Sequence, residues 1–278
     1  MYKTLDPGAL GFGTTLLEAA EAAAACGFEG YWCGAGRDFS APMEKTKEAL
    51  EKSGLKAAGF GLPLDFRKDA ETFADGLDKL PQYAKYASEI GAKRTMTWIL
   101  PFHETLDYAD NFNLHRDRLK KVAEVLGSYG IQFGLEFVGT PSLRRTGKKK
   151  FIENLDETLE LCHAIGEPNM GVMMDVWHWD FAGHTLSDFS KFSGRNQIAA
   201  VHINDAPAGV KPEAQQDGCR TLPGATGVLN VADFFKGLAG LKYDGPVMAE
   251  PFDKTLGQME FKRALDATIK AINGVWPK

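Results

Sequence analysis

The sequence predicts an α/β protein that folds as a single-domain (β/α)8 barrel, a TIM barrel, over residues 1–278. Short apolar runs alternate with longer helical patterns along the whole chain, which is typical of a parallel sheet covered by helices. The chain holds eight such strand–helix units, and eight units favour a closed barrel over an open sheet. No linker rich in Pro or Ser and no shift in composition marks a domain boundary.

An open doubly wound sheet is the alternative fold, and it would need a glycine-rich phosphate-binding turn. Gly8, Gly11 and Gly13 have the wrong spacing for a GxGxxG motif, and Gly34 with Gly36 is too short a match. We therefore interpret these glycines as turns at strand ends.

Strands are expected where apolar or alternating runs are bounded by turn residues. They are residues 9–13, 28–33, 55–60, 93–99, 131–138, 170–175, 198–204 and 246–250. Helices are expected where apolar residues recur at the spacing of one helix face. They are residues 14–27, 43–52, 70–90, 114–126, 155–165, 186–192, 231–241 and 261–272.

Local signals mark several helix ends. Thr14 and Thr15, followed by Glu18, predict a hydroxyl cap with an acidic residue in the first turn of the first helix. Gly27 is a typical C-terminal stop for that helix. Pro81 could divide the long 70–90 helix, because proline cannot donate a backbone hydrogen bond.

Composition and local sequence give no support to several classes of protein. The formal net charge is −5, whereas a nucleic-acid-binding protein usually presents a basic face. The four cysteines show no CxxC spacing and are too few for a disulfide framework, so we expect them to be reduced. The first residues lack the apolar core of a signal peptide, and no run approaches the roughly 18 apolar residues of a membrane helix. A cytoplasmic protein is therefore expected.

Four successive predicted strands each carry one potential metal ligand near their carboxyl ends. They are Glu136, Asp175, His202 and Glu250. Active sites of barrels of this class lie at the carboxyl ends of the strands, so the four groups are expected at one rim. Strand alternation sends the neighbours of Glu136 and of His202 to the opposite face. The polar groups can therefore converge inside the barrel.

Three carboxylates and one imidazole in a dry rim favour a divalent cation. An oxygen-rich site with one nitrogen suits Mn²⁺, Mg²⁺ or Co²⁺, with Zn²⁺ as a further candidate, and Mn²⁺ is the ion we expect. The alternative is a hydrogen-bonded polar rim without metal, which leaves like charges uncompensated.

Other polar residues are expected beside this rim. His178 follows Asp175, Arg220 lies in the long loop after the seventh strand, and His103 follows the fourth strand. Each could contact substrate, or be an ordinary loop or surface residue. The aromatic residues Trp32, Phe66, Trp98, Trp177 and Trp179 could wall the cavity or belong to the core. The basic run 144–150 follows the fifth strand, so it could attract an anionic substrate or simply be a solvated loop.

These motifs, in this order and spacing, resemble those of the sugar phosphate isomerase/epimerase superfamily, the xylose isomerase-like TIM barrels. The resemblance is strongest to inosose isomerase-like proteins and weaker to ketose 3-epimerases. It rests on the segments Leu135-Glu136-Phe137-Val138-Gly139, Asp175-Val176-Trp177-His178, Val201-His202-Ile203-Asn204-Asp205, the loop from Arg220 to Gly227, and Ala249-Glu250-Pro251-Phe252.

The resemblance implies that Glu136, Asp175, His202 and Glu250 are metal ligands. It also implies substrate contacts at His178 and Arg220. Two features depart from the pattern. Ala225 and Thr226 stand where the family's Pro-Gly-x-Gly loop has one residue, and the basic run 144–150 is not typical of inosose isomerases.

A divalent metal beside two glutamates suits proton abstraction next to a carbonyl through an enediolate. We therefore expect an isomerase or epimerase of carbohydrate metabolism, acting on a keto-sugar, keto-cyclitol or related polyol, with Glu136 and Glu250 transferring the proton. A lyase or dehydratase would share the first step.

Two other functions fit the sequence less well. An endonuclease IV-type repair enzyme would need more histidine ligands and a basic face, and a non-catalytic sugar-binding barrel would not need intact ligands. No nucleic-acid or membrane partner is expected, and the sequence leaves open whether the chain forms a homo-oligomer.

Overall fold

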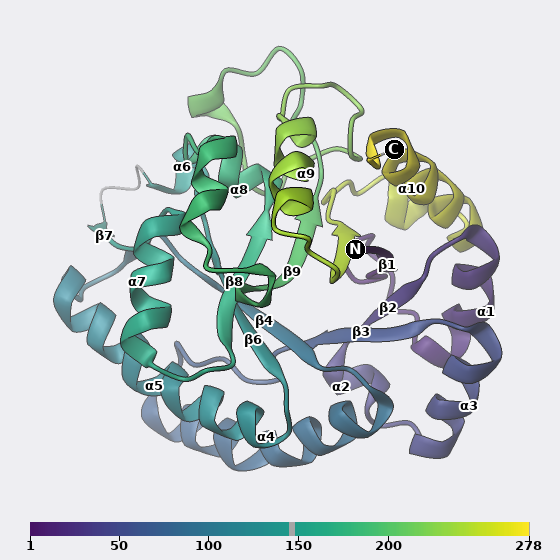
Figure 1. Ribbon diagram of the computed structural model, residues 1–278, viewed down its shortest axis with the longest axis horizontal. Helices are drawn as coiled ribbons and strands as arrows, with labels where there is room; N and C mark the ends of the chain where they lie inside the picture. Colours follow the sequence, from purple (N-terminus) through teal and green to yellow (C-terminus); the bar gives the residue numbers. More distant parts are fainter. Residues whose placement is uncertain (145–147, 278) are drawn as a thin grey trace.

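The computed structural model describes residues 1–144 and 148–277, and within them the chain forms a closed barrel of eight parallel strands (Figure 1). The strands follow the order β1-β10-β9-β8-β6-β4-β3-β2 around the barrel. They are β1 (Tyr2–Leu5), β2 (Gly30–Cys33), β3 (Lys56–Gly61), β4 (Arg94–Ile99), β6 (Gln132–Phe137), β8 (Met170–Asp175), β9 (Ile198–Ile203) and β10 (Pro246–Ala249). The predicted (β/α)8 barrel is therefore confirmed.

Helices surround the strands and cover the outside of the barrel (Figure 1). The helices are α1 (Leu16–Cys26), α2 (Ala35–Asp38), α3 (Met43–Ser53), α4 (Ala70–Ile90), α5 (Tyr108–Ser128), α6 (Pro141–Arg144), α7 (Leu155–Ile165), α8 (Val176–Phe181), α9 (Val231–Gly240) and α10 (Phe261–Val275). The predicted 186–192 helix is the 3-10 turn Leu186–Lys191. Among the helices described, none is both long and apolar enough to cross a membrane.

The first strand lies earlier in the chain than predicted. Residues 2–5 form β1, which pairs with β10 and β2, whereas residues 9–13 form turns and coil. Gly11 adopts a φ of 85°, which glycine reaches without steric cost, and its amide donates to the carbonyl of Gly8 at 3.0 Å. The glycines around residue 10 therefore make a turn, and the prediction of a strand at 9–13 is wrong.

Thr15 caps α1 as a capping box with Glu18, and Gly27 ends the helix in the left-handed conformation with φ 99°. Both features follow from the sequence signals. Helix α4 runs unbroken through Pro81, so the expected division does not occur. The buried face of α4, which includes Leu80 and Ala84, lies on both sides of the proline, and its burial offsets the one hydrogen bond that proline cannot donate.

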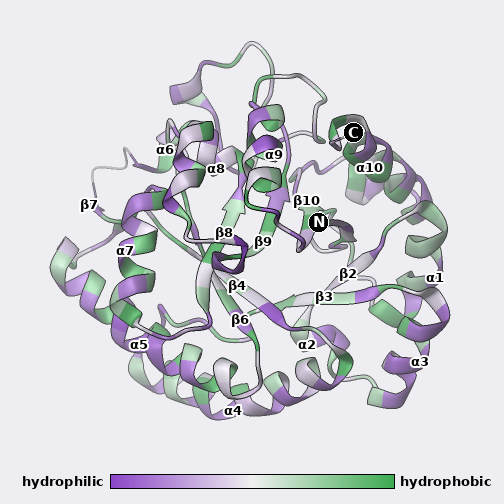
Figure 2. Cartoon of the chain, viewed as in Figure 1, coloured by the Kyte–Doolittle hydropathy of each residue, from purple (hydrophilic) through white to green (hydrophobic). Residues whose placement is uncertain are grey.

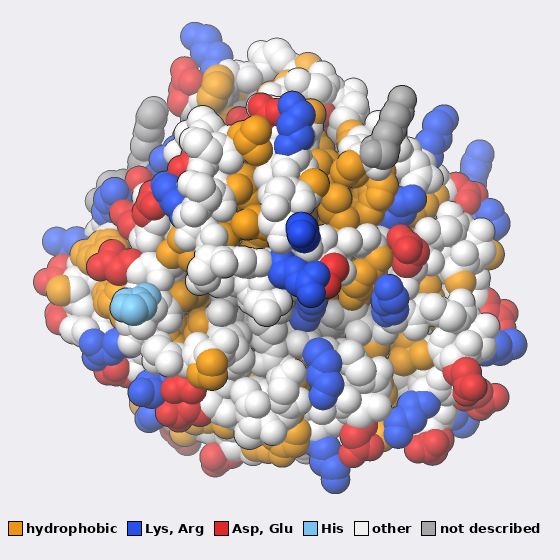
Figure 3. Space-filling model, viewed as in Figure 1, with side chains coloured by type: hydrophobic (Ala, Val, Ile, Leu, Met, Phe, Trp, Pro, Cys, Tyr) orange, Lys and Arg blue, Asp and Glu red, His pale blue; other side chains and the backbone are white. Residues whose placement is uncertain are grey.

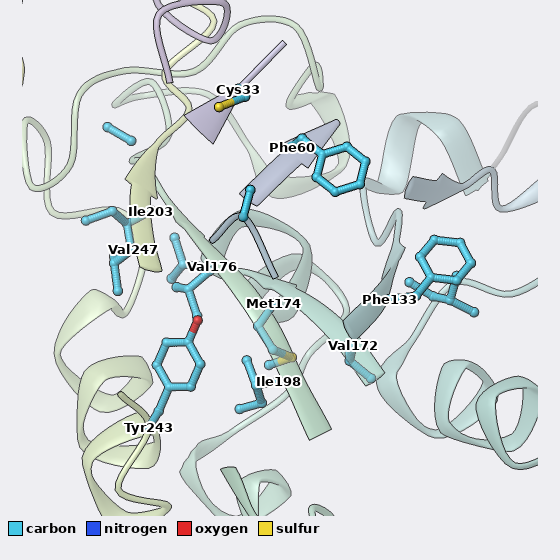
Figure 4. Close-up of a cluster of buried hydrophobic side chains, with 14 of the residues drawn as sticks. Cys33, Phe60, Phe133, Val172, Met174, Val176, Ile198, Ile203, Tyr243 and Val247 are labelled. Atoms are coloured by element: carbon cyan, nitrogen blue, oxygen red, sulfur yellow. The ribbon is translucent and has the colours of Figure 1, made fainter. Parts of the chain in front are cut away.

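Apolar side chains fill two regions of the barrel. The larger region lies between strands and helices, and Figure 4 shows part of it, with Phe60, Phe133, Val172 and Ile203 among its labelled members. Helices carry hydrophobic and hydrophilic residues on the same ribbon, as expected for elements that cover a core on one face (Figure 2).

The smaller apolar region consists of Trp32, Ala58, Met173, Ala200 and Met248. Met173 and Ala200 each lie two residues before a predicted site residue on the same strand, and Met248 lies two residues before Glu250, which directly follows β10. Strand alternation therefore points each of them to the same face as that site residue. They form the apolar floor on which the polar rim rests.

A small antiparallel sheet joins β5 (Phe102–His103) to β7 (Lys149–Lys150) beside the barrel. It contains the end of the basic run 144–150, of which residues 145–147 lie outside the described residues. Lys150 Nζ lies 3.2 Å from Glu153 Oε1, so this lysine has an acidic partner. Figure 3 shows acidic and basic side chains interspersed over the visible face of the molecule.

Candidate metal and substrate site

Four side chains converge at the carboxyl ends of four consecutive strands of the barrel. Glu136 lies on β6, Asp175 ends β8, His202 lies on β9 and Glu250 directly follows β10. One potential ligand atom from each lies within 4.8 Å of the others. Strand register sets this arrangement, since Asp175 pairs directly with His202 and Met248 pairs with His202 on its other side. The structure therefore brings together the four residues that the sequence singled out.

Several buried polar atoms at this rim have no hydrogen-bond partner among the described residues. They include Glu136 Oε1 and His202 Nδ1, which lie 3.7 Å apart. Glu250 Oε2 lies 3.4 Å from the same His202 nitrogen. Buried polar atoms are normally satisfied, so this cluster of unpartnered atoms fits a bound cation. Three carboxylates and an imidazole nitrogen are also a donor set that divalent metals accept.

Burial and charge separate the two glutamates. Burial raises the pKa of Glu136, and the nearby Glu250 charge adds to that effect. Burial opposes ionisation of Glu250 as well, but the charges of His202 and Arg220 outweigh it and lower the pKa of Glu250 to about 2. Burial opposes the charged form of His202, yet the two glutamates raise its pKa. The pocket thus favours positive charge at its centre.

Asp175 makes hydrogen bonds with both of its oxygens. Oδ1 accepts from the backbone amide of Trp177 at 2.8 Å, which caps α8, and from Asn204 Nδ2 at 3.0 Å. Oδ2 accepts from Arg220 Nη1 at 2.6 Å. The strand-end aspartate therefore caps a helix and is also one of the four candidate metal ligands.

Arg220 crosses the wall of the site with its side chain only 1% exposed. Nη1 donates to Asp175 and also to Glu250 Oε2 at 2.7 Å. Nε donates to the carbonyl of Asp217 at 3.0 Å, and Nη2 donates to Asp217 Oδ1 at 2.9 Å. Nη2 also lies 3.2 Å from His178 Nε2. Arg220 therefore links two ligand carboxylates to the loop that precedes it.

His178 on α8 is buried and faces the same arginine. Its Nδ1 accepts from the backbone amide of Gly139 at 3.2 Å, while Arg220 Nη2 approaches Nε2. A neutral imidazole has one accepting nitrogen, so these two donors compete for one lone pair. Gly139 is needed for this contact, because a Cβ at residue 139 would overlap the His178 carbonyl.

His103 lies apart from this cluster. It sits in the small sheet, where its Nδ1 accepts from the amides of Thr105 and Leu106 at 3.1 and 2.9 Å. It does not line the cavity into which the ligand cluster opens. Its predicted contact with substrate stays a prediction that this position does not favour.

Three of the four candidate ligands, Glu136, His202 and Glu250, line a cavity of about 310 Å³, whereas Asp175 is fully buried behind it. The lining of this cavity consists of Asp6, Trp32, Gly61, Met96, Trp98, Glu136, Val138, His178, His202, Asp217, Arg220, Glu250 and Phe252. Two of the candidate wall aromatics, Trp32 and Trp98, belong to the lining, whereas Phe66, Trp177 and Trp179 are fully buried in the core.

Sequence reasoning missed two acidic residues of the lining. Asp6 follows β1 and escaped notice because the first strand was placed at residues 9–13, although a charge directly after Leu5 was a usable signal. Asp217 lies in a long loop without any periodic pattern.

The additional residue in the loop after Arg220 finds a partner in Asp205. The amides of Thr226 and Gly227 both donate to Asp205 Oδ2, at 2.9 and 2.6 Å, and Thr226 Oγ1 donates to the carbonyl of Ala206. Asp205 also pairs with Thr221, the neighbour of Arg220, through two backbone hydrogen bonds of 3.0 and 2.9 Å. One buried carboxylate therefore shapes the loop and fixes its arginine.

Comparison with known proteins agrees with the fold. The sequence profile described as "Xylose isomerase-like TIM barrel" matches residues 18–272. An inosose isomerase from Halalkalibacterium halodurans is 25% identical over 162 residues, which make up 56% of this chain and 53% of the relative. The match thus spans about half the length of that curated relative.

Two solved structures are similar over almost the whole chain. A xylose isomerase domain protein from Alicyclobacillus acidocaldarius is 26% identical with a TM-score of 0.86, covering 99% of this chain and 98% of that one. The IolI protein, solved with a zinc atom, has a TM-score of 0.83 and 15% identity, again covering 99% and 98%. At 15% identity the likeness to IolI shows the fold alone.

Proposed function

Because the chain belongs to the xylose isomerase-like TIM barrel family, we propose that it is a divalent-metal-dependent isomerase or epimerase of a keto-sugar or keto-cyclitol. The observation that carries the proposal is the group of four residues that each offer one ligand atom within 4.8 Å of the others. Two atoms of this group, Glu136 Oε1 and His202 Nδ1, are buried without hydrogen-bond partners in the described chain. The inosose isomerase relative supports a keto-cyclitol or a similar polyol as substrate.

Glu136, Asp175, His202 and Glu250 would hold the metal, for which we propose Mn²⁺ on the grounds of the oxygen-rich donor set. When bound, such a cation supplies Lewis-acid stabilisation of the negative charge that develops on a carbonyl oxygen. The zinc atom of IolI supports a metal of similar charge in a related barrel.

Glu136 and Glu250 are the proposed proton-transfer groups. They approach the centre from β6 and β10, which are separated by two strands in the barrel order, so they reach a substrate from different sides. Arg220 donates to Glu250 and holds its carboxylate in place. Glu136 Oε1 has no hydrogen bond within the described chain, so it is available to a substrate proton or to the metal.

His178 and Arg220 are proposed to orient substrate oxygens. The Arg220–His178 contact is the longest of the arginine's hydrogen-bond contacts, and Arg220 competes there with the Gly139 amide for the one accepting nitrogen of a neutral imidazole. A substrate hydroxyl that inserts there would satisfy both groups, and such positioning lowers the entropic barrier to proton transfer.

The fate of the proton after its abstraction decides between isomerisation, epimerisation and elimination. Return of the proton to the neighbouring carbon gives isomerisation, and return to the other face of the same carbon gives epimerisation. A leaving group β to the carbonyl would instead be expelled, which would make the protein a lyase or dehydratase.

The proposal is tested by incubating Mn²⁺-loaded protein in deuterated water with a panel of keto-sugars and inososes. We expect deuterium to enter the carbon next to the carbonyl of one of them, with a rearranged product visible by NMR. Loss of a substituent would identify a lyase. Neither exchange nor product with any keto-sugar or inosose would contradict the proposed function.

A further inference from the structure

The cavity has two chemically different halves. All four metal-ligand candidates lie on or directly after the strands β6, β8, β9 and β10, which are neighbours in the barrel. The remaining strands, β1 to β4, form the other half of the closed circle, and β1 is four positions from β6 in either direction. A substrate held by its reacting carbons at the candidate ligands can therefore place its remaining carbons against the wall formed by β1 to β4.

That second half is largely apolar, with one carboxylate. Its lining residues are Asp6, Trp32, Gly61, Met96 and Trp98. Trp32 is 4% exposed, whereas Trp98 is 47% exposed. Aromatic rings beside a carboxylate match the two surfaces of a sugar or cyclitol, which has C–H faces and hydroxyl edges.

The Asp6 carboxylate is fixed in position and only partly used. Asp6 follows Thr4 by two residues, so strand alternation points it to the barrel interior with Thr4. Its Oδ1 accepts from the amide of Gly8 at 2.8 Å and from that of Ala9 at 3.4 Å. Its Oδ2 makes no hydrogen bond with any described residue. One oxygen therefore anchors the side chain, and the other is left for a ligand.

Asp6 lies outside the group of metal-ligand candidates in the described chain, so the metal does not account for its free oxygen. Its environment disfavours a second negative charge. Arg220 is the only Lys or Arg among the described lining residues. Four of the five hydrogen-bond contacts of Arg220 go to oxygens of Asp175, Glu250 and Asp217, which leaves little for a phosphate.

We propose that Asp6 is a specificity-determining residue: it accepts a hydrogen bond from a hydroxyl on the non-reacting part of a neutral polyol substrate and disfavours phosphorylated analogues. This inference rests on the proposed function, which brings a keto-polyol to the ligand cluster. It concerns the part of the substrate that does not react, which is inferred to carry hydroxyl groups and no phosphate.

Asp6→Asn is the direct test, because asparagine keeps an oxygen for the Gly8 amide while removing the charge. Its matched control is Asp244→Asn. Asp244 is exposed, pairs with Arg195 at 3.0 Å and precedes β10, at the end of the barrel opposite the cavity. Both variants lose one negative charge, so a difference in their affinities for the probes reports on the position of Asp6 in the cavity. Elemental analysis confirms that both retain metal.

The probes are D-fructose, 2-keto-myo-inositol and D-fructose 6-phosphate, titrated into the Mn²⁺-loaded protein by calorimetry. We expect the unaltered protein to bind a neutral probe roughly tenfold or more tighter than the phosphate ester. Asp6→Asn should weaken binding of the neutral probe by roughly 10- to 100-fold, the range for a hydrogen bond to a charged group. It should also reduce the difference in affinity between the neutral probe and the phosphate ester. Asp244→Asn should match the unaltered protein.

Unchanged neutral binding in Asp6→Asn, equal binding of the ester, or no binding of either neutral probe overturns the assignment. The isotope-exchange assay separates this inference from the proposed function. If no isotope exchange occurs but Asp6→Asn still weakens binding of the neutral probe, only the proposed isomerase activity is refuted. If exchange is normal and Asp6→Asn binds the neutral probe as tightly as the unaltered protein, only the role of Asp6 is refuted.

Discussion

Arg220 Nη1 lies 2.6 Å from Asp175 Oδ2, and both side chains are almost completely buried. A buried ion pair that loses one partner leaves the other charge without compensation, at a cost of roughly 3–5 kcal/mol. Asp175 also accepts from Trp177 and Asn204. One side chain therefore belongs to the group of candidate metal ligands, caps a helix and pairs with a buried cation. Its substitution therefore has two measurable consequences.

Asp175→Asn should lower both metal content and stability, because an amide is a poorer ligand and a poorer partner for Arg220. We expect a fall of roughly 3 kcal/mol in the free energy of unfolding of the metal-free protein. Denaturant unfolding after chelation measures the stability effect, and elemental analysis measures the metal. A variant with full metal content would show that Asp175 is not a ligand.

His178→Ala should leave the metal bound while raising KM or lowering kcat, since His178 faces Arg220 rather than the ligand cluster. His103→Ala is the matched control, because His103 lies outside the cavity, and its kinetics should stay close to those of the unaltered protein. Loss of metal in His178→Ala would mean that the ligand assignment is wrong.

Glu136→Gln and Glu250→Gln should each reduce turnover by roughly 10²–10⁴-fold, the contribution of a general base, with metal still partly bound. Glutamine keeps the size of the side chain and one ligand oxygen but cannot take a proton. Single-turnover assays with matched metal loading separate the loss of chemistry from the loss of metal. Near-normal turnover in both variants would move the base to another residue, with His178 the next candidate in the cavity.

The purified protein should contain about one divalent ion per chain, on the strength of the four-ligand cluster. Chelation should abolish turnover, and added Mn²⁺ should restore it. Elemental analysis before and after dialysis against chelator is the measurement. Turnover that survives complete removal of the ion would refute a metal-dependent reaction.

His115 gives the stability a defined pH dependence. Burial is the main cause that lowers the pKa of His115 to about 4, and the hydrogen bond of its Nδ1 with the Asn111 carbonyl at 2.8 Å only partly offsets it. The unfolded chain binds this proton near pH 6.5 and the folded chain only near pH 4, so stability falls as pH drops through that window. The loss should reach roughly 2–4 kcal/mol.

Denaturant unfolding between pH 7 and pH 4 measures the effect of His115. His115→Gln should make the free energy of unfolding less dependent on pH in this window. Substitution of the exposed His163 by Gln is the control and should leave that dependence in place. If the free energy of unfolding of His115→Gln falls with pH as steeply as that of the unaltered protein, the acid sensitivity arises from other groups.

Elements with a strong internal pattern were predictable from the sequence. The boundaries of β8 and α7 match the prediction to the residue, because β8 is buried along its length and α7 begins after the Asn154 cap and ends at Gly166. The metal-ligand candidates were predictable for a related reason: a charged side chain at the end of a buried strand is costly unless an opposite charge or a bound ion compensates it.

Features set by distant residues were not predictable. Strand β1 has only four residues, and its identity depends on pairing with β10, more than 240 positions away in sequence. Asp217 reaches the site through its contact with Arg220 in a loop without periodicity. The continuity of α4 through Pro81 depends on tertiary burial that local propensity does not contain.

The division of the cavity between two sets of strands has a consequence for how changes in sequence could alter ligand specificity. The metal-ligand candidates lie on strands drawn from residues after 131, whereas the wall that faces the rest of the substrate comes from residues before 100. Exchange of the amino-terminal segment between relatives would thus alter which molecule is accepted while the metal-ligand residues are inherited intact.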